Sequence, residues 1–188
     1  MIKIGITGAL ASGKTTASKI LSSRRGPLFN ADKVVREIYK SNKFKFLIKK
    51  HFGINDQKEI KTTIKRLIFR NKNNIKTLEK IIHPMVRKKM KSFSLEYKNK
   101  KTLFYEIPLL IESKLTDFFD VIIFIKANKQ IRLRRFKSKK GDLKLFNLLN
   151  NKQMTDREKA KFCNYVVVNE KNKKVLKKKL LDIIKNYE

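Results

Sequence analysis

The first sixteen residues, MIKIGITGALASGKTT, most constrain what this chain can fold into. Ile2, Ile4 and Ile6 alternate with other residues in a short β-rich run that ends at Gly8, and this pattern predicts a strand. The spacing G-x-x-x-x-G-K-[ST] then runs from Gly8 to Thr15. A strand followed at once by this spacing and a helix start is typical of a phosphate-binding loop.

Each residue type in the loop suits phosphate chemistry. Gly8 and Gly13 allow backbone angles that side chains disfavour, so the loop can aim its N–H groups at one anion. Lys14 is expected to reach the β- and γ-phosphates of a nucleotide, and the hydroxyl of Thr15 to bind Mg²⁺. The predicted nucleotide-binding residues of the loop are Gly8, Ala9, Leu10, Ala11, Ser12, Gly13, Lys14, Thr15 and Thr16.

The length and composition predict one domain. A chain of 188 residues with 41% hydrophobic residues can bury a substantial core. The longest apolar run, residues 121–125, is far shorter than the ~20 residues that span a bilayer, and the N-terminus reads as a strand rather than a signal peptide. We therefore expect a soluble, cytoplasmic protein that does not bind membranes. The single cysteine, Cys163, excludes an internal disulfide and makes a zinc site improbable.

The formal net charge of +32 by itself favours a nucleic-acid binder. However, the 38 lysines greatly outnumber the 10 arginines and are spread along the chain, as a bias in composition would leave them. Arginine is the usual residue for bidentate phosphate and base recognition. We therefore predict no specific nucleic-acid partner, and only salt-sensitive adhesion to polyanions.

Two carboxylates follow predicted strands. Asp32 comes after a short strand at residues 27–29, and Glu106 ends a strand at residues 102–106. Ligands of parallel α/β sheets bind at the carboxyl ends of strands, so both should face the phosphate loop. Glu106 is predicted to hold a water of the Mg²⁺ shell. For Asp32, a catalytic role and an N-cap of a helix at residues 33–40 are both open.

Residues 44–100 show helical periodicity without a convincing strand. Helices are predicted at residues 44–52, 59–70, 75–82 and 86–97, as an insertion between the second and third strands. The pair His83-Pro84 is expected to end one helix and start the next. A single histidine is usually structural, but at such a junction His83 could also project into a cleft.

The last third of the chain contains two further strands and a basic segment. Strands are predicted at residues 120–125 and 165–168, and an amphipathic helix at residues 173–187 closes the fold. Between the strands, Arg132, Arg134 and Arg135 lie within four residues, followed by Lys139 and a helix that extends to residue 153. The segment is either a solvated basic helix or a charged flap over transferring phosphates, and clustered arginines favour the flap.

Together these motifs resemble the dephospho-coenzyme A kinase family over essentially the full chain. The resemblance rests on the phosphate loop, Ala31-Asp32, His83-Pro84, Gln153, the run from Pro108 to Glu112 and the run from Tyr165 to Asn169. Departures are Ala9 and Ala11 in the loop, Asn30 two residues before Asp32, Lys139-Lys140-Gly141 in the lid, and Cys163-Asn164 before the last strand.

The resemblance implies an α/β P-loop kinase fold: a five-stranded parallel sheet flanked by helices, with a helical substrate-binding insertion and a basic lid. The core would comprise residues 1–31, 101–128 and 163–188, the helical lobe residues 32–100, and the lid residues 129–162. The implied reaction moves the γ-phosphoryl group of ATP to the 3′-hydroxyl of dephospho-coenzyme A. The rival classes are another P-loop small-molecule kinase, such as a nucleoside monophosphate kinase, and a nonenzymatic or ATP-driven nucleic-acid protein.

The resemblance also implies roles for individual residues. Asp32, Lys14 and Arg135 would be catalytic, with Arg132, Arg134 and Lys139 as alternatives to Arg135. Asn169 would contact the nucleotide, and Thr15 and Glu106 would hold Mg²⁺. The acceptor substrate would contact Asp32, His83, Pro108, Leu109 and Glu112. We expect a monomer or a small homo-oligomer.

Overall fold

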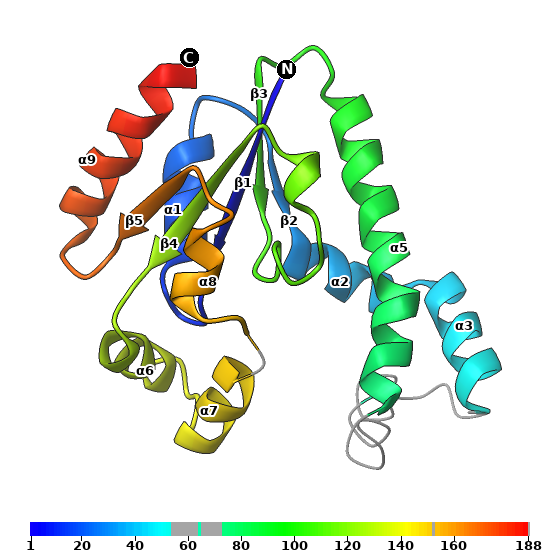
Figure 1. Ribbon diagram of the computed structural model, residues 1–188. Coiled ribbons are helices and arrows are strands. Elements are labelled where there is room, and N and C mark those ends of the chain that lie inside the picture. The colour runs from blue at the N-terminus through cyan, green and yellow to red at the C-terminus, as the bar shows by residue number, and fades with distance from the viewer. Residues whose placement is uncertain (54–63, 65–72, 152, 188) are drawn as a thin grey trace. The chain divides into compact units, whose positions relative to one another are not determined.

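A computed structural model describes residues 1–53, 64, 73–151 and 153–187 of the chain. The strands form one five-stranded sheet in the order β2-β3-β1-β4-β5, and every neighbouring pair is parallel (Figure 1). The strands are β1 (Ile2–Gly8), β2 (Leu28–Asn30), β3 (Thr102–Glu106), β4 (Val121–Lys126) and β5 (Tyr165–Val168). The five expected strands are therefore confirmed, each within one residue or two of its predicted bounds.

The chain divides into two compact units. One, the sheet unit, comprises Met1–Asn30 and Tyr97–Glu188, and the other, the helical unit, comprises Ala31–Glu96. Among the described residues, the five strands all belong to the sheet unit, and the helical unit is inserted between β2 and β3. Parallel neighbours need such crossover connections, since a short hairpin can join only antiparallel strands.

One face of the sheet packs against α1 (Lys14–Ser22) and α9 (Lys173–Ile184), which lie beside each other (Figure 1). The periodic apolar residues of both helices meet the side chains of the central strands in one buried cluster. Its fully buried members include Ile4, Ile6, Ala17, Leu21 and Leu180. Burying each such Leu or Ile is worth about 1.5–3 kcal/mol relative to exposure, so this contact fixes the α1 end of the phosphate loop on the sheet.

Aromatic side chains cover the opposite face. The buried ring of Tyr105 makes edge contacts with Phe118 and Phe119, with centroids 5.6 and 5.3 Å away. Gly5 permits this packing, because a Cβ there would lie 2.7 Å from Leu110 Cδ1 and 3.0 Å from the Phe119 ring. The segment after β3 can thus lie directly on β1.

The helical unit contains α2 (Ala31–Lys40), α3 (Asn42–Phe52) and α5 (Asn73–Glu96). The predicted helix break at His83-Pro84 is wrong, because α5 continues through Pro84. Leu78 and Ile81 before the proline and Val86 and Met90 after it are all buried at helical spacing. This continuous apolar stripe offsets the hydrogen bond that proline removes. The predicted helix at residues 59–70 lies outside the described residues.

Three further helices of the sheet unit lie between β4 and β5: α6 (Lys129–Lys137), α7 (Leu143–Asn151) and α8 (Asp156–Ala160). The prediction that Gln153 lies in a helix is wrong, since α7 ends at Asn151. Helix α8 was not predicted from the sequence, and its start is fixed by a capping box. Thr155 Oγ1 accepts the Glu158 N–H at 3.3 Å, and Glu158 Oε2 accepts the Thr155 N–H at 2.8 Å.

The closing helix was predicted correctly. It forms α9 and continues as a 3₁₀ turn, η2 (Lys185–Tyr187). Among the described residues, no helix is both long and apolar enough to cross a membrane.

Candidate active site

The phosphate loop joins β1 to α1, as expected from its spacing. Gly13 has a φ of 101°, a left-handed angle that residues with a Cβ rarely adopt, and a Cβ there would meet Asn169 Nδ2. A Cβ on Gly8 would collide with the carbonyl oxygen of Ile125. The two glycines are therefore needed for the loop to curl against neighbouring strands. Ala11 also has a positive φ, of 59°, without being glycine.

Lys14 lies over the loop rather than in solvent. Its Nζ donates to the carbonyl oxygens of Gly8 and Ala9, each at 2.9 Å, and the residue is 9% exposed. The ammonium group is thus held at the mouth of the loop, at the start of α1, where the helix dipole also favours an anion. Thr15 and Thr16 follow in the first turn of α1 and are exposed.

Glu106 is the centre of a buried polar cluster. Its Oε1 accepts from Thr15 Oγ1 at 2.6 Å, and its Oε2 accepts from Ser18 Oγ at 2.9 Å and from Asn30 Nδ2 at 2.7 Å. Only 2% of Glu106 is exposed. Three donors therefore fix both oxygens of this carboxylate and compensate for its burial.

This cluster fits a hard cation such as Mg²⁺ through oxygen donors. Because Thr15 gives its single proton to Glu106, its hydroxyl lone pairs stay available to a metal ion. The hydrogen bonds from Ser18 and Asn30 to Glu106 were not predicted from the sequence. Ser18 lies one turn after Lys14 on α1, and Asn30 pairs with Glu106 in the parallel register of β2 and β3.

Arg135 and Asn169 meet around the carbonyl oxygen of Ser12, near the α1 end of the loop. Asn169 Nδ2 donates to this oxygen at 2.8 Å, and Arg135 Nη1 does so at 3.2 Å. Arg135 Nη2 also donates to the carbonyl oxygen of Asn169 at 3.0 Å. Two residues that sequence reasoning assigned to the lid and to the end of β5 are thus brought directly onto the loop.

Arg132 has a different setting from Arg135. It is only 6% exposed, and its guanidinium group donates to Ala127 O, to Leu10 O and to Asn150 Oδ1 at 3.0, 3.4 and 2.7 Å. Burial lowers the pKa of Arg132 from its ordinary value, and the charge of nearby Asp156 opposes this shift. Arg132 thus ties α6 to the loop and to the end of α7, whereas Arg134 and Lys139 are exposed.

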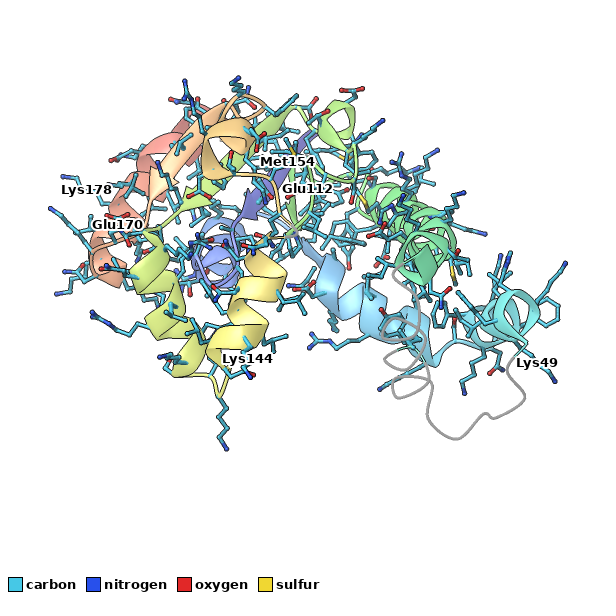
Figure 2. The ribbon with its side chains drawn as sticks, turned by 60° about the horizontal axis from the view of Figure 1, so that its bottom comes forward. Lys49, Glu112, Lys144, Met154, Glu170 and Lys178 are labelled. Atoms are coloured by element: carbon cyan, nitrogen blue, oxygen red, sulfur yellow. The ribbon has the colours of Figure 1, made fainter. Side chains whose placement is uncertain are left out.

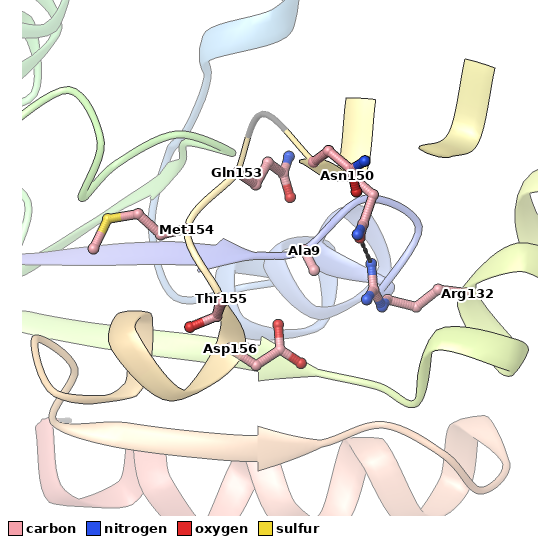
Figure 3. A pocket seen from close by; sticks show the side chains of 8 residues that line it. Ala9, Arg132, Asn150, Gln153, Met154, Thr155 and Asp156 are labelled. Carbon is pink, nitrogen blue, oxygen red and sulfur yellow. Dashed lines mark hydrogen bonds between the residues drawn. The ribbon is translucent and has the colours of Figure 1, made fainter. Parts of the chain in front are cut away.

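A cavity of about 400 Å³ adjoins the loop on the side of Arg132 (Figure 3). Gln153 and Asn150 point into the space beside Ala9, and the dashed line in Figure 3 marks the Arg132–Asn150 bond. Gln153 Oε1 accepts the Leu10 N–H at 3.1 Å, so this loop amide already has a partner within the protein. The lining residues are Ala9, Arg132, Asn150, Asn151, Gln153, Met154, Thr155 and Asp156.

The segment after β3 carries three predicted acceptor-binding residues. The carbonyl oxygen of Pro108 accepts from Thr7 Oγ1 at 3.1 Å, and Leu109 is 39% exposed. Glu112 instead pairs with Lys159 of α8, with Oε1 and Nζ 2.8 Å apart, and the same oxygen accepts the Met154 N–H at 3.1 Å. Figure 2 shows Glu112 and Met154 near each other. No sequence pattern indicated that Lys159 would be fully buried.

Asp32 and His83 belong to the helical unit. Asp32 is exposed in the first turn of α2, which begins at Ala31, so the alternative that Asp32 precedes the helix as its N-cap is wrong. A carboxylate at this position interacts favourably with the helix dipole instead. His83 is half-buried within α5.

Comparison with known proteins assigns the chain to a family. The family model for dephospho-CoA kinase matches residues 2–174. The dephospho-CoA kinase of Bartonella quintana is 30% identical, over 97% of this chain and 96% of that protein. That of Rickettsia prowazekii is also 30% identical, over 100% of this chain and 98% of that protein.

Comparison with solved structures agrees with this family assignment. The Thermus thermophilus protein TT1252 has a TM-score of 0.82 at 26% identity, covering 100% of this chain and 98% of that one. The dephospho-CoA kinase from Campylobacter jejuni has a TM-score of 0.71 at 25% identity, covering 98% and 96%. Shikimate kinase from Aquifex aeolicus, at 18% identity and a TM-score of 0.56, shares the P-loop kinase fold alone. The chain therefore belongs to the dephospho-CoA kinase family.

Proposed function

We propose that this protein transfers the γ-phosphoryl group of ATP to the 3′-hydroxyl of dephospho-coenzyme A, the last step of coenzyme A synthesis. The observation that carries this proposal is the position of Lys14 at the start of α1, where its Nζ donates to the carbonyl oxygens of Gly8 and Ala9. In a member of this family, such a loop is the site where ATP phosphates bind.

Lys14 and the loop supply charge to the ATP phosphates. The N–H groups at the start of α1 would face the phosphates of ATP, and Lys14 can exchange its loop carbonyls for phosphate oxygens. Arg135 and Asn169 hold the loop from the side of β5. Arg135, which is only partly buried, can also contribute its charge to the transferring group.

Thr15, oriented by Glu106, would hold Mg²⁺ through its hydroxyl oxygen. When bound, Mg²⁺ neutralises charge on the β- and γ-phosphates and keeps them aligned for transfer. Glu106 then acts as the acceptor that keeps the proton of Thr15 turned away from the ion. Ser18 and Asn30 support this orientation by occupying the other oxygen of Glu106.

Asp32 is the proposed general base. Its carboxylate accepts the proton of the 3′-hydroxyl as that oxygen attacks the γ-phosphorus, and the bond to the leaving ADP oxygen breaks. His83, Pro108 and Leu109 are proposed to contact the acceptor, within a helical lobe at residues 32–100 and the segment after β3. Residues 129–162 would act as the lid, excluding water from the reaction.

One assay tests this function. The purified protein is given ATP and Mg²⁺ with dephospho-coenzyme A, with nucleoside monophosphates, or with pantetheine intermediates, and ADP release is measured. We expect turnover with dephospho-coenzyme A alone, and a product with a new phosphate on the 3′-oxygen. Turnover confined to a nucleoside monophosphate would contradict the proposal, and the Lys14→Ala variant gives the background from other kinases.

A further inference from the structure

The peptide group between Ala9 and Leu10 has a partner at each end. Its carbonyl oxygen, on Ala9, accepts from Lys14 Nζ at 2.9 Å and from Ser12 N at 3.2 Å. Its N–H, on Leu10, donates to Gln153 Oε1 at 3.1 Å. A trans peptide group is planar, so its N–H and carbonyl point in opposite directions and turn together. An acceptor fixed on the N–H of Leu10 therefore sets the direction of the carbonyl that holds Lys14.

The backbone next to Gln153 is held in turn by a buried ion pair. Met154 N donates to Glu112 Oε1, the same oxygen that lies 2.8 Å from Lys159 Nζ. The Lys159 side chain is fully buried and that of Glu112 is 17% exposed, so water competes little for either charge. The capping box of Thr155 and Glu158 fixes the next turn. We call Glu112 and Lys159 the brace.

We propose that Gln153 is a positioning residue. By fixing the orientation of the Ala9–Leu10 peptide group it sets the position of the Lys14 ammonium group, and the brace holds Gln153 in place. Glu112 then acts from within the protein and need not touch the acceptor substrate. The inference deepens the proposed function and rests on it only where ATP turnover is measured.

The first test replaces Gln153 with methionine, which keeps the length of the side chain and removes the acceptor. In the protein without nucleotide, we expect hydrogen exchange of the Leu10 amide to become at least about 10-fold faster, since its partner is lost. The KM for ATP should rise about 5-fold, the scale of one hydrogen bond, while the KM for dephospho-coenzyme A stays unchanged. Gln153→Glu keeps an acceptor oxygen at the same reach and should restore slow exchange at Leu10.

The second test removes the brace. Glu112→Leu combined with Lys159→Met deletes both charges together, because removing one alone would strand the other in the interior. We expect the same faster exchange at Leu10 as in Gln153→Met, and no further change when all three substitutions are combined. Such non-additivity is what residues in one network show. Lys185→Met, which removes a lysine from an exposed pair with Asp182 at 3.8 Å, serves as the control.

Two results would overturn the proposal. If Gln153→Met leaves both Leu10 exchange and the KM for ATP within twofold of the parent, Gln153 does not position the loop. If the brace variant leaves Leu10 exchange unchanged, or its effect adds to that of Gln153→Met, the brace is only structural. If the brace variant fails to fold, the exchange and KM measurements on Gln153→Met still test the role of Gln153. The exchange readout needs no turnover, so it decides even if dephospho-coenzyme A is not the substrate.

Discussion

Thr15 Oγ1 and Glu106 Oε1 are 2.6 Å apart, and this hydrogen bond joins the first turn of α1 to the carboxyl end of β3. Ser18 and Asn30 donate to the other carboxylate oxygen, so three donors from α1 and β2 converge on one buried group. A carboxylate can accept all three bonds because it offers only acceptor sites.

The Glu106→Gln variant should unfold more easily, because an amide turns one of these acceptors into a donor. Its NH₂ group would face a donor on one side of the cluster. We expect a loss of about 1–3 kcal/mol in the free energy of unfolding, measured with urea. Glu170→Gln is the control, since exposed Glu170 accepts one backbone bond, from Asn128 N at 2.9 Å. Equal losses of unfolding free energy in the two variants would show that the buried acceptors of Glu106 matter no more than the one exposed bond of Glu170.

Replacing Ala11 with glycine should instead stabilise the protein. Its φ of 59° is costly for a residue with a Cβ, by about 1–2 kcal/mol, and glycine avoids that cost. Glycine loses more entropy on folding, by roughly 0.5–1 kcal/mol. We therefore expect Ala11→Gly to raise the free energy of unfolding by about 0.5–1 kcal/mol. Ala160→Gly, at the end of α8, should lower it, and destabilisation by both would mean that Ala11 is not strained.

The thiol of Cys163 should react slowly in the native protein. Burial raises its pKa to about 11 from an ordinary value of 9.0, although Lys159 acts in the opposite direction. At pH 8 the thiolate is then about 100-fold scarcer than in the unfolded chain. Its reaction with a disulfide reagent should be slower in buffer than in urea by about that factor. Similar rates in both would contradict the shift.

The same shift has a consequence for stability. The folded thiol keeps its proton over a pH range in which the unfolded thiol loses it. The contribution of Cys163 to stability is therefore fully present below pH 9 and falls as the pH rises toward 11.

The sheet could be predicted from sequence because each strand is a short β-rich run bounded by turn residues. The phosphate loop could be predicted because its glycines, Lys14 and Thr15 have a fixed spacing along the chain. Such signals are local, and the structure keeps them nearly residue for residue. The continuous α5 could not be predicted in this way, because the local signal of Pro84 is overridden by a buried stripe on both sides of it.

The contacts around the loop come from residues far apart in sequence. Gln153 reaches Leu10 across 143 positions, and Asn169 reaches Ser12 across 157. Glutamine, asparagine and lysine are common surface residues, so their identity alone marks neither Gln153 as a partner of the loop nor Lys159 as a buried residue. Family resemblance singled out Gln153, but only the folded chain shows the bond it makes.

Lys14→Ala is the direct test of the phosphate loop. The side chain lies on backbone carbonyls rather than in the apolar core, so its removal should leave the fold intact. Turnover should fall by at least about 10²- to 10³-fold, the usual effect of removing one donor to the reacting charge, and ATP should bind more weakly. Exposed Lys19, in the last turn of α1, supplies the control Lys19→Ala. Normal turnover of Lys14→Ala would exclude the loop as the catalytic phosphate site.

Asp32→Asn separates a catalytic from a structural role at the start of α2. Asn is nearly the same size but carries no charge, so loss of the favourable interaction with the helix dipole should cost only about 0.3–1 kcal/mol of stability. If Asp32 accepts the proton of the 3′-hydroxyl, turnover should fall by roughly 10²- to 10⁴-fold, the scale of a general base. The KM for ATP should change little, because the lost interaction belongs to the transition state.

Glu37→Gln, on an exposed position of the same helix, controls for charge alone. A drop in melting temperature without a comparable loss of turnover per folded molecule would assign Asp32 to stability.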